Sequence, residues 1–320
     1  MTSISVVVPC RDAAGTLPHT LAALAAQDLD QQYEVIVVDD GSADGSPQLA
    51  MAAPGVTLVR EAGAGPGPAR NAGVARARGS LLAFTDADCV PRPDWLRAGV
   101  AALADADLVQ GMVVPDPRVP RGPFDRTISV RHEFGLYETA NTFVRRELFE
   151  RLGGFHDPLR ARLGKPLGED VWFGWRARRA GARVAFSEAA VVEHAVFARS
   201  RRAYVGERLR LVYFPQMVAL IPELRERFLW RRWFLGRRNA AFAGGAGGLV
   251  SSGIAAALSA PLPLVLAPLL AWVPYARIAV SEAAGWRRRA PDVLATGVAA
   301  DLVGFAALLA GTLRSRTPVL

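Results

Sequence analysis

Cysteine is scarce in this sequence, which limits the chemistry open to the chain. Only Cys10 and Cys89 occur among the 320 residues. They are far apart and neither belongs to a Cys-x-x-Cys pair, which argues against a disulfide framework and against a metal or redox role for the thiols. The opening MTSISVVVPC lacks a basic start and reaches a proline within its apolar run, so no secretory signal is expected. Two unpaired cysteines suit a reducing compartment.

Acidic residues are outnumbered by basic ones, and the formal charge is +8. The sequence has no zinc-finger spacing, no RNP-like motif and no basic helix before heptads, so nucleic acid is not expected as a partner. The basic residues are overwhelmingly arginine, and they crowd between Arg199 and Arg238 and again at Arg287–Arg289. Both clusters flank hydrophobic segments, and this placement favours a membrane as a partner.

Charged side chains are absent from residues 240–276, near the C-terminus. At about 1.5 Å per helical residue, this segment is longer than one bilayer span, although prolines interrupt it. A second apolar segment, Val293 to Leu313, has about the length of one span, with glycines every seven residues at 297, 304 and 311. Asp301 lies in the middle of it and must face other helices or an interface.

We therefore expect residues 239–320 to form a hydrophobic, helical, membrane-associated region. If both arginine clusters stay on the cytoplasmic side, the first apolar segment must enter the membrane and return as a hairpin. An alanine-rich soluble helical bundle is the alternative.

The first hundred residues alternate between strand-like and helix-like blocks. Buried strands are predicted at Ile4–Pro9, Tyr33–Asp40, Val56–Arg60 and Ser80–Asp88, because these runs are short and apolar. Strands that alternate with helices predict an α/β fold with a mostly parallel sheet flanked by helices. In such sheets ligands bind beyond the carboxyl ends of the strands.

The pattern after residue 108 is mixed. Proline-rich residues 111–125 predict a loop. A helix is expected from Glu169 to Gly181, with a strand after it that contains His194.

Acidic residues collect where the predicted strands end. Asp39 and Asp40 follow the second strand, and Asp86 and Asp88 follow the fourth. Four carboxylates at one rim would repel each other unless a divalent cation or a hydrogen-bonding ligand lies there, and oxygen ligands suit Mg²⁺ or Mn²⁺. The alternative is that these residues only cap helices and form turns, for which DDGSADGS is well suited. Cys89 is expected to be a small buried neighbour.

Five motifs, in order from Ser3 to His194, resemble those of the family 2 glycosyltransferases, which have the GT-A fold. They are VVVPCRD, with Asp12 in place of the usual Asn, VVDDGSADGS, GPGPARNAGVARARGSLLAFTDAD, TANTFVRRELFERLGGF and GEDVWFGWRARRAG. The resemblance implies a GT-A (Rossmann-like) domain over residues 1–238. Its nucleotide-binding half would span about 1–115 and its acceptor half about 116–238.

The resemblance also implies the roles of individual residues. The nucleotide would be held by Pro9, Asp39, Asp40, Arg70 and Asp86. The metal, Mn²⁺ or Mg²⁺, would be bound mainly by Asp88, with Asp86 and His194. The catalytic base of an inverting transfer would be Asp170, in the first turn of its helix. Physical reasoning alone does not separate Asp170 from Glu169, so this choice rests on the family pattern. Asn71 would cap or orient its loop.

The implied function is the transfer of a single sugar from a nucleoside diphosphate sugar, with UDP-sugar favoured, to a hydroxyl acceptor. Processive members carry Gln-x-x-Arg-Trp after the base, and the nearest match here, LWRRW at Leu229–Trp233, lacks the glutamine. The membrane segments suggest a lipid or lipid-linked glycan as acceptor, at the cytoplasmic face of the cell membrane. Two alternatives are a polyprenyl-phosphate glycosyltransferase and an inactive nucleotide-sugar-binding scaffold.

Overall fold

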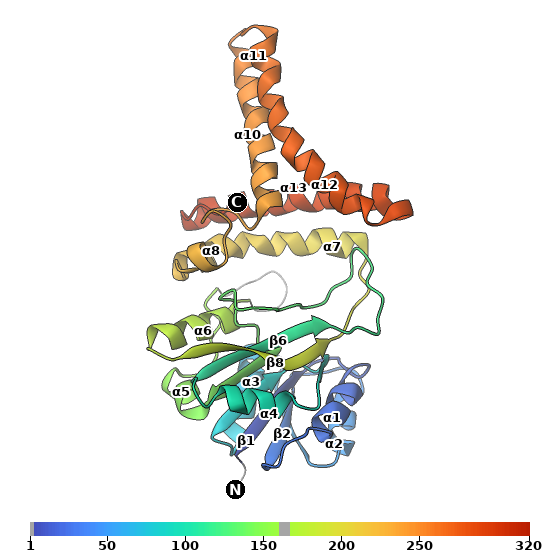
Figure 1. Cartoon of the computed structure of the whole chain (residues 1–320), viewed down its shortest axis with the longest axis vertical. Coiled ribbons are helices and arrows are strands. Elements are labelled where there is room, and N and C mark those ends of the chain that lie inside the picture. Colours follow the sequence, from blue (N-terminus) through green and yellow to red (C-terminus); the bar gives the residue numbers. More distant parts are fainter. Residues whose placement is uncertain (1–2, 160–166) are drawn as a thin grey trace. The chain divides into compact units, whose positions relative to one another are not determined.

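The computed structural model describes residues 3–159 and 167–320, and the chain forms two compact units (Figure 1). Unit 1 comprises Met1–Arg121 and Asp125–Phe197, and unit 2 comprises Gly122–Phe124 and Ala198–Leu320. Relative to the expected boundary near residue 238, unit 2 also takes in residues 198–238, because these helices pack against the C-terminal helix of the chain.

Unit 1 is built on an eight-stranded sheet with the strand order β3-β2-β1-β4-β7-β6-β8-β5. The strands are β1 Ile4–Cys10, β2 Tyr33–Asp39, β3 Val56–Arg60, β4 Leu81–Thr85, β5 Cys89–Pro91, β6 Leu108–Pro115, β7 Asn141–Arg145 and β8 Val184–His194. The first four strands are parallel to one another, as are β6 and β8. The prediction of a mostly parallel α/β sheet is therefore confirmed.

Helices cover both faces of this sheet, and continuous apolar strands make that possible. The helices of unit 1 are α1 Leu17–Ala25, α2 Ser46–Ala52, α3 Pro66–Arg76, α4 Trp95–Ala102, α5 Arg146–Arg151 and α6 Glu169–Arg179. Strand β1 is buried along almost its whole length because side chains on both of its faces pack into the core. Gly73 of α3 allows a close approach to β1, since a Cβ there would lie 2.4 Å from Val7 Cγ1.

Two strands, β7 and β5, run antiparallel to their neighbours. Strand β7 lies between β4 and β6, and β5 pairs with the end of β8. The predicted loop over residues 111–125 is wrong in its first five residues, which belong to β6. Met112 to Pro115 pair in register with Val191 to His194, so the neighbouring strand fixes an extended conformation despite the proline at the end.

Unit 2 is helical. Its shorter helices are α7 Arg201–Glu207, η1 Arg208–Tyr213, α8 Phe214–Leu220, α9 Leu224–Arg227, α11 Leu262–Leu266, η2 Ala267–Trp272, α12 Val273–Ala284 and η3 Arg287–Arg289; the longest are α10 Arg237–Ala257 and α13 Ala290–Ser315. Three stretches of helix, 237–257, 262–284 and 287–315, are long and apolar enough to cross a membrane. These C-terminal helices fit the expected membrane association. Phe242, Trp272, Tyr275 and Phe305 form a small aromatic core where they meet.

Candidate active site

The carboxyl ends of β1, β2 and β4 place the acidic residues at one edge of the sheet. Cys10, the last residue of β1, pairs with Asp39, the last residue of β2. Strand β4 runs parallel to β1 on its other side and ends one residue before Asp86. Pro9 is the penultimate residue of β1 and is half-buried at this edge. The parallel register therefore brings residues from three separate motifs together.

The two aspartates after β2 are buried and shape the loops around them. Asp39 Oδ1 accepts a hydrogen bond from the Ser42 amide at 3.1 Å. Asp40 Oδ2 accepts one from the Gly65 amide at 2.9 Å, which fixes the turn that opens α3. Asp40 Oδ1 is also buried, yet it has no hydrogen-bond partner among the described residues. A buried carboxylate oxygen without a donor is costly, so this atom is suited to bind a ligand N–H.

Arg70 of α3 connects two of the motifs. Its side chain is 4% exposed, and Nη2 donates to Asp86 Oδ1 at 2.6 Å. Its Nη1 lies 3.9 Å from Glu169 Oε1, at the start of α6. Its Nε is buried without a partner among the described residues. One guanidinium thus joins the end of β4 to the start of α6, with a donor left for a ligand.

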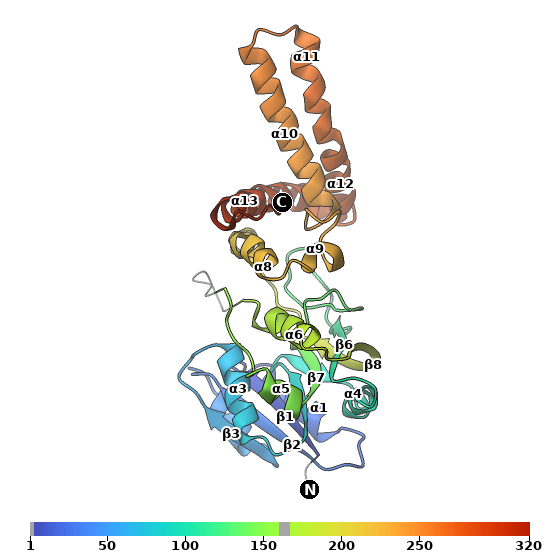
Figure 2. The same ribbon diagram turned by 90° about the vertical axis from the view of Figure 1, so that its left-hand side faces the viewer.

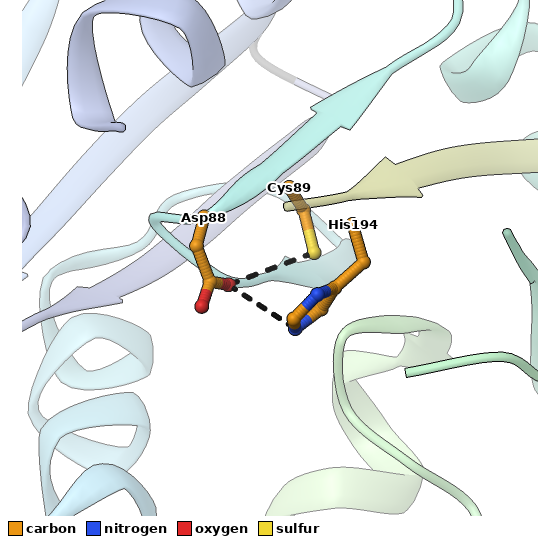
Figure 3. A group of neighbouring side chains, drawn as sticks. All are labelled: Asp88, Cys89 and His194. Carbon is orange, nitrogen blue, oxygen red and sulfur yellow. Dashed lines mark hydrogen bonds and ion pairs between the residues drawn. The ribbon is translucent and has the colours of Figure 1, made fainter. Parts of the chain in front are cut away.

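Asp88, Cys89 and His194 form a group that could hold a metal ion, with their ligand atoms all within 4.8 Å of one another (Figure 3). His194 Nε2 lies 3.6 Å from Asp88 Oδ1. The antiparallel pairing of β5 with β8 creates this group, because Cys89 and His194 are direct register partners. Asp86 is outside the group in the part of the chain that the structure describes, and its Oδ1 is bound to Arg70.

The imidazole of His194 is oriented by its own strand end. Nδ1 lies 2.7 Å from the Ala195 carbonyl oxygen. A carbonyl oxygen can only accept, so Nδ1 carries the proton, and in the neutral ring the lone pair of Nε2 points towards Asp88. The ring is 3% exposed, and Thr127 Oγ1 lies 3.3 Å from Nδ1. This is the arrangement that a metal-binding histidine needs.

The charge balance around Asp88 also favours a cation. Burial raises the pKa of the Asp88 carboxyl, and the negative charge of Asp86 raises the pKa further, while His194 and Arg126 oppose the shift. A bound cation would offset both unfavourable effects. Burial raises the pKa of the Cys89 thiol well above its ordinary value, so it stays a neutral donor towards Asp88, at 3.9 Å. The ligands that the group offers a divalent cation are therefore the hard carboxylate of Asp88 and the borderline imidazole of His194.

Asp170 lies in the first turn of α6, one residue after the acid that Arg70 contacts. Burial raises the pKa of Asp170 well above its ordinary value, and the nearby carboxylates of Glu169 and Glu138 raise the pKa further. Arg70 opposes the shift. A carboxylate with a raised pKa is a stronger base than an ordinary aspartate, which suits proton abstraction near neutral pH.

Sequence reasoning missed two charged residues of this region and left the role of the uncharged Asn71 open. Glu138 directly precedes the TANTF motif, and burial raises the pKa of its carboxyl. Arg126 directly follows the proline-rich segment and is close enough to lower the pKa of Asp88. Asn71 was expected to cap or orient its own loop, and in the structure its side-chain amide donates to and accepts from the backbone of Phe155, in a different segment, at 2.8 and 2.9 Å. Only the position of Glu138 beside a motif could have pointed to it.

Comparisons with known proteins show what the chain is similar to. Residues 5–162 match the family described as Glycosyl transferase family 2. Glycosyltransferase AglE of Haloferax volcanii is 30% identical over 200 residues, which cover 58% of this chain and 64% of AglE. An undecaprenyl-phosphate 4-deoxy-4-formamido-L-arabinose transferase of Aeromonas hydrophila is 36% identical over 118 residues, 34% of this chain and 36% of that protein. The chain thus spans less than two thirds of the length of these curated relatives.

A solved structure extends the likeness to the fold. The mannosyltransferase PcManGT from Pyrobaculum calidifontis, solved in complex with GDP-Man and Mn²⁺, aligns with a TM-score of 0.55 and 22% identity, over 98% of this chain and 86% of that chain. Motifs, strand order and family match agree, and the chain carries a family 2 glycosyltransferase domain of the GT-A fold.

Proposed function

We propose that the chain catalyses an inverting transfer of one sugar from a nucleoside diphosphate sugar, with a UDP-sugar favoured, to a hydroxyl acceptor. The main support is the bridge that Arg70 makes between Asp86 and Glu169. Asp88 and Asp170 each lie within two residues of an end of this bridge. It therefore holds the metal-binding side and the base side of the site together. We also propose that residues 1–238 form the catalytic part of the chain and residues 239–320 its membrane part.

The nucleotide would bind at the edge formed by Pro9, Asp39 and Asp40. The unpartnered Asp40 Oδ1 can accept a hydrogen bond from an N–H of the nucleobase. The unpartnered Nε of Arg70 can donate a hydrogen bond to an oxygen of the nucleotide sugar. Asp86, held by Arg70, would face the sugar and ribose part of the donor. The choice of uridine follows the family resemblance.

A divalent cation, Mn²⁺ or Mg²⁺, fits Asp88 and His194. Two ligand atoms about 2.1 Å from one octahedral cation are about 3 Å apart, and the 3.6 Å between His194 Nε2 and Asp88 Oδ1 is close to this value. When bound, the cation neutralises the diphosphate and makes it a better leaving group. Arg70 binds Asp86 through Oδ1, so Asp86 would join as a further ligand through its other carboxylate oxygen.

Asp170 would take the proton from the acceptor hydroxyl as that oxygen attacks the anomeric carbon. Its raised pKa makes it a stronger base than an ordinary aspartate, and the positive charge of Arg70 favours the ionised form. The acceptor would be a lipid or a lipid-linked glycan, and the site would work at the cytoplasmic face of the cell membrane. The apolar helices of unit 2 and the names of the relatives support this choice.

The experiment is to replace Asp88 by Asn and to measure nucleotide-sugar turnover with and without Mn²⁺, after a screen of nucleotide sugars has fixed the donor. We expect loss of most turnover, with little recovery on added Mn²⁺. The matched control is Asp105→Asn, because Asp105 is an exposed acid in the turn after α4. Equal turnover of the Asp88 and Asp105 variants would refute the metal role.

A second candidate function is transfer to a polyprenyl phosphate, which the name of the Aeromonas relative favours. A phosphate acceptor is already anionic and needs no general base. Replacement of Asp170 by Asn separates the two functions. A loss of about 10²-fold or more in kcat supports a hydroxyl acceptor, whereas a loss of less than about tenfold supports a phosphate acceptor.

A further inference from the structure

Helix α13 is the most apolar of the three candidate membrane helices, and its length and composition alone would make it the best transmembrane segment of the chain. Its contacts inside unit 2 point to a different position. Figures 1 and 2 show α10 and α11–α12 as a hairpin that stands on α13, while α13 runs crosswise to α10 and alongside α7 and α8.

Ion pairs fix the start and the middle of α13 to segments at the base of the hairpin. Asp292 accepts hydrogen bonds from both terminal nitrogens of Arg201, at 2.9 and 2.8 Å. Asp301 accepts from Arg238 Nε at 2.8 Å and from the Tyr275 hydroxyl at 2.7 Å. Arg238 is the second residue of α10 and also pairs with Glu282. The midpoint of α13 thus lies at the level where the hairpin begins.

The segment after α13 returns to the same level. The Leu320 amide donates to the Trp233 carbonyl at 2.9 Å, and the Leu235 amide donates to the Leu320 carbonyl at 3.1 Å. Trp233 and Leu235 directly precede α10. The beginning, middle and end of α13 are therefore all held beside the base of the hairpin, which a helix perpendicular to the bilayer could not achieve.

The two sides of α13 differ in what they contact. The glycine face packs on η1 and α8: a Cβ at Gly311 would lie 2.3 Å from the Val212 carbonyl oxygen, and one at Gly304 would lie 3.2 Å from Leu211 Cδ1. The exposed large apolar side chains of α13 recur at helical spacing on the other side; they are Val298, Leu302, Leu309 and Leu313. An amphipathic arrangement of this kind suits a helix that lies in the interface of a bilayer.

The arginines that flank these helices are consistent with a position of all of them at one face of the membrane. Arg237 and Arg238 open α10, and Arg287–Arg289 follow α12. Arg314 and Arg316 mark the end of α13. A spanning α13 would separate Arg314 and Arg316 from the other arginines by the whole bilayer. A flat α13 keeps all of them among the anionic headgroups of one leaflet, where each is stabilised.

We propose that α10 and α11–α12 enter the bilayer as a hairpin while α13 lies in the headgroup interface. The exposed apolar side of α13 then faces the acyl chains, and both ends of unit 2 stay on the same side of the membrane. With 21 residues, α10 is about 31 Å long, close to the thickness of the hydrocarbon core. Asp301 avoids the bilayer centre, where an ionised acid is strongly disfavoured.

The test is cysteine labelling of the full chain in sealed membrane vesicles, with a maleimide that cannot cross the membrane. Arg316→Cys reports the end of α13, and Pro318→Cys is a second reporter if the first disturbs folding; both positions are exposed. Ala104→Cys, exposed in unit 1, marks the side from which the chain enters. The unsubstituted chain gives the background, since Cys10 and Cys89 are buried.

We expect the C-terminal reporters and Ala104→Cys to be labelled from the same side, with no labelling beyond background from the other side. A further reporter, Ser259→Cys, lies at the exposed tip of the hairpin and should resist labelling from the Ala104 side until detergent is added. Labelling of the C-terminal reporters from the opposite side would overturn the flat position of α13. Free labelling of Ser259→Cys from the Ala104 side would overturn insertion of the hairpin. Neither readout depends on the donor, the metal or turnover.

Discussion

Replacement of Arg70 by Met should destabilise unit 1, because it leaves two carboxylates without their cation. Asp86 and Glu169 both contact the guanidinium, at 2.6 and 3.9 Å. The Arg70 side chain is 4% exposed, that of Glu169 9% and that of Asp86 25%. Removal of one partner of a buried ion pair costs about 3 to 5 kcal/mol, and the partial exposure of Asp86 favours the lower end. We therefore expect a loss of about 3 kcal/mol.

The measurement is hydrogen exchange of the β1 and β4 amides in the full-length protein in detergent, since these strands carry the core of unit 1. The matched control is Arg97→Met, because Arg97 and Asp28 form an exposed ion pair 3.3 Å long. An exposed pair contributes little, so this variant should exchange like the unsubstituted chain.

A double variant tests whether the loss comes from uncompensated charge. Asp86→Asn combined with Arg70→Met removes one of the two carboxylates that Arg70→Met alone leaves unpaired. The combined loss should be smaller than the sum of the single losses by at least about 1 kcal/mol, because residues in direct contact are coupled. If the Arg70 variant were as stable as the Arg97 variant, or the double variant strictly additive, Arg70 would not be the electrostatic link between the two motifs.

Three further predictions follow from the same site. Asp170 accepts a proton only when ionised, so activity should fall as the pH drops through its raised pKa. Glu138→Gln removes a negative neighbour and should lower the pKa of Asp170. The acidic limb of the pH–rate profile should therefore move to lower pH in this variant. His194→Ala should raise the Mn²⁺ concentration for half-maximal activity about 10- to 100-fold, and an unchanged requirement would exclude it as a ligand. Asn71→Ala removes both hydrogen bonds to the Phe155 backbone and should lower the midpoint of urea unfolding, at a cost of about 1 to 3 kcal/mol. An unchanged midpoint would show that these hydrogen bonds do not stabilise the loop.

Strands β1 and β2 could be predicted because each is a continuous apolar, β-branched run whose pattern does not depend on its neighbours. The strands that pair with β8 were harder to predict. Strand β5 has three residues, and the second half of β6 contains Gly111 and Pro115, so their extended conformation is imposed by pairing with β8. Local pattern carries no information about such a partner.

Asp39, Asp40, Asp86 and Asp88 could be singled out from the sequence because they follow predicted strands, whereas Asp170 was chosen from the family pattern. The surroundings of these acids could not be predicted from the sequence. Glu138 and Arg126 influence Asp170 and Asp88 through space, from segments whose local sequence gives them no distinguishing pattern. The orphaned oxygen of Asp40 likewise appears only once the loops are folded around it.

The sequence by itself determined the alternation of strands and helices, the carboxylates at strand ends and the apolar segments near the C-terminus, because each is a property of neighbouring residues. Tertiary structure decided which distant residues meet. The antiparallel register of β5 and β8 brings His194 to Asp88, and Arg70 joins two motifs through its burial between them. Helix α13 has the composition of a membrane span, but Asp301 and the glycine face position it through contacts with Arg238 and η1, which lie elsewhere in the chain. Composition measures how apolar a helix is, whereas its orientation depends on the partners that its polar and small residues find.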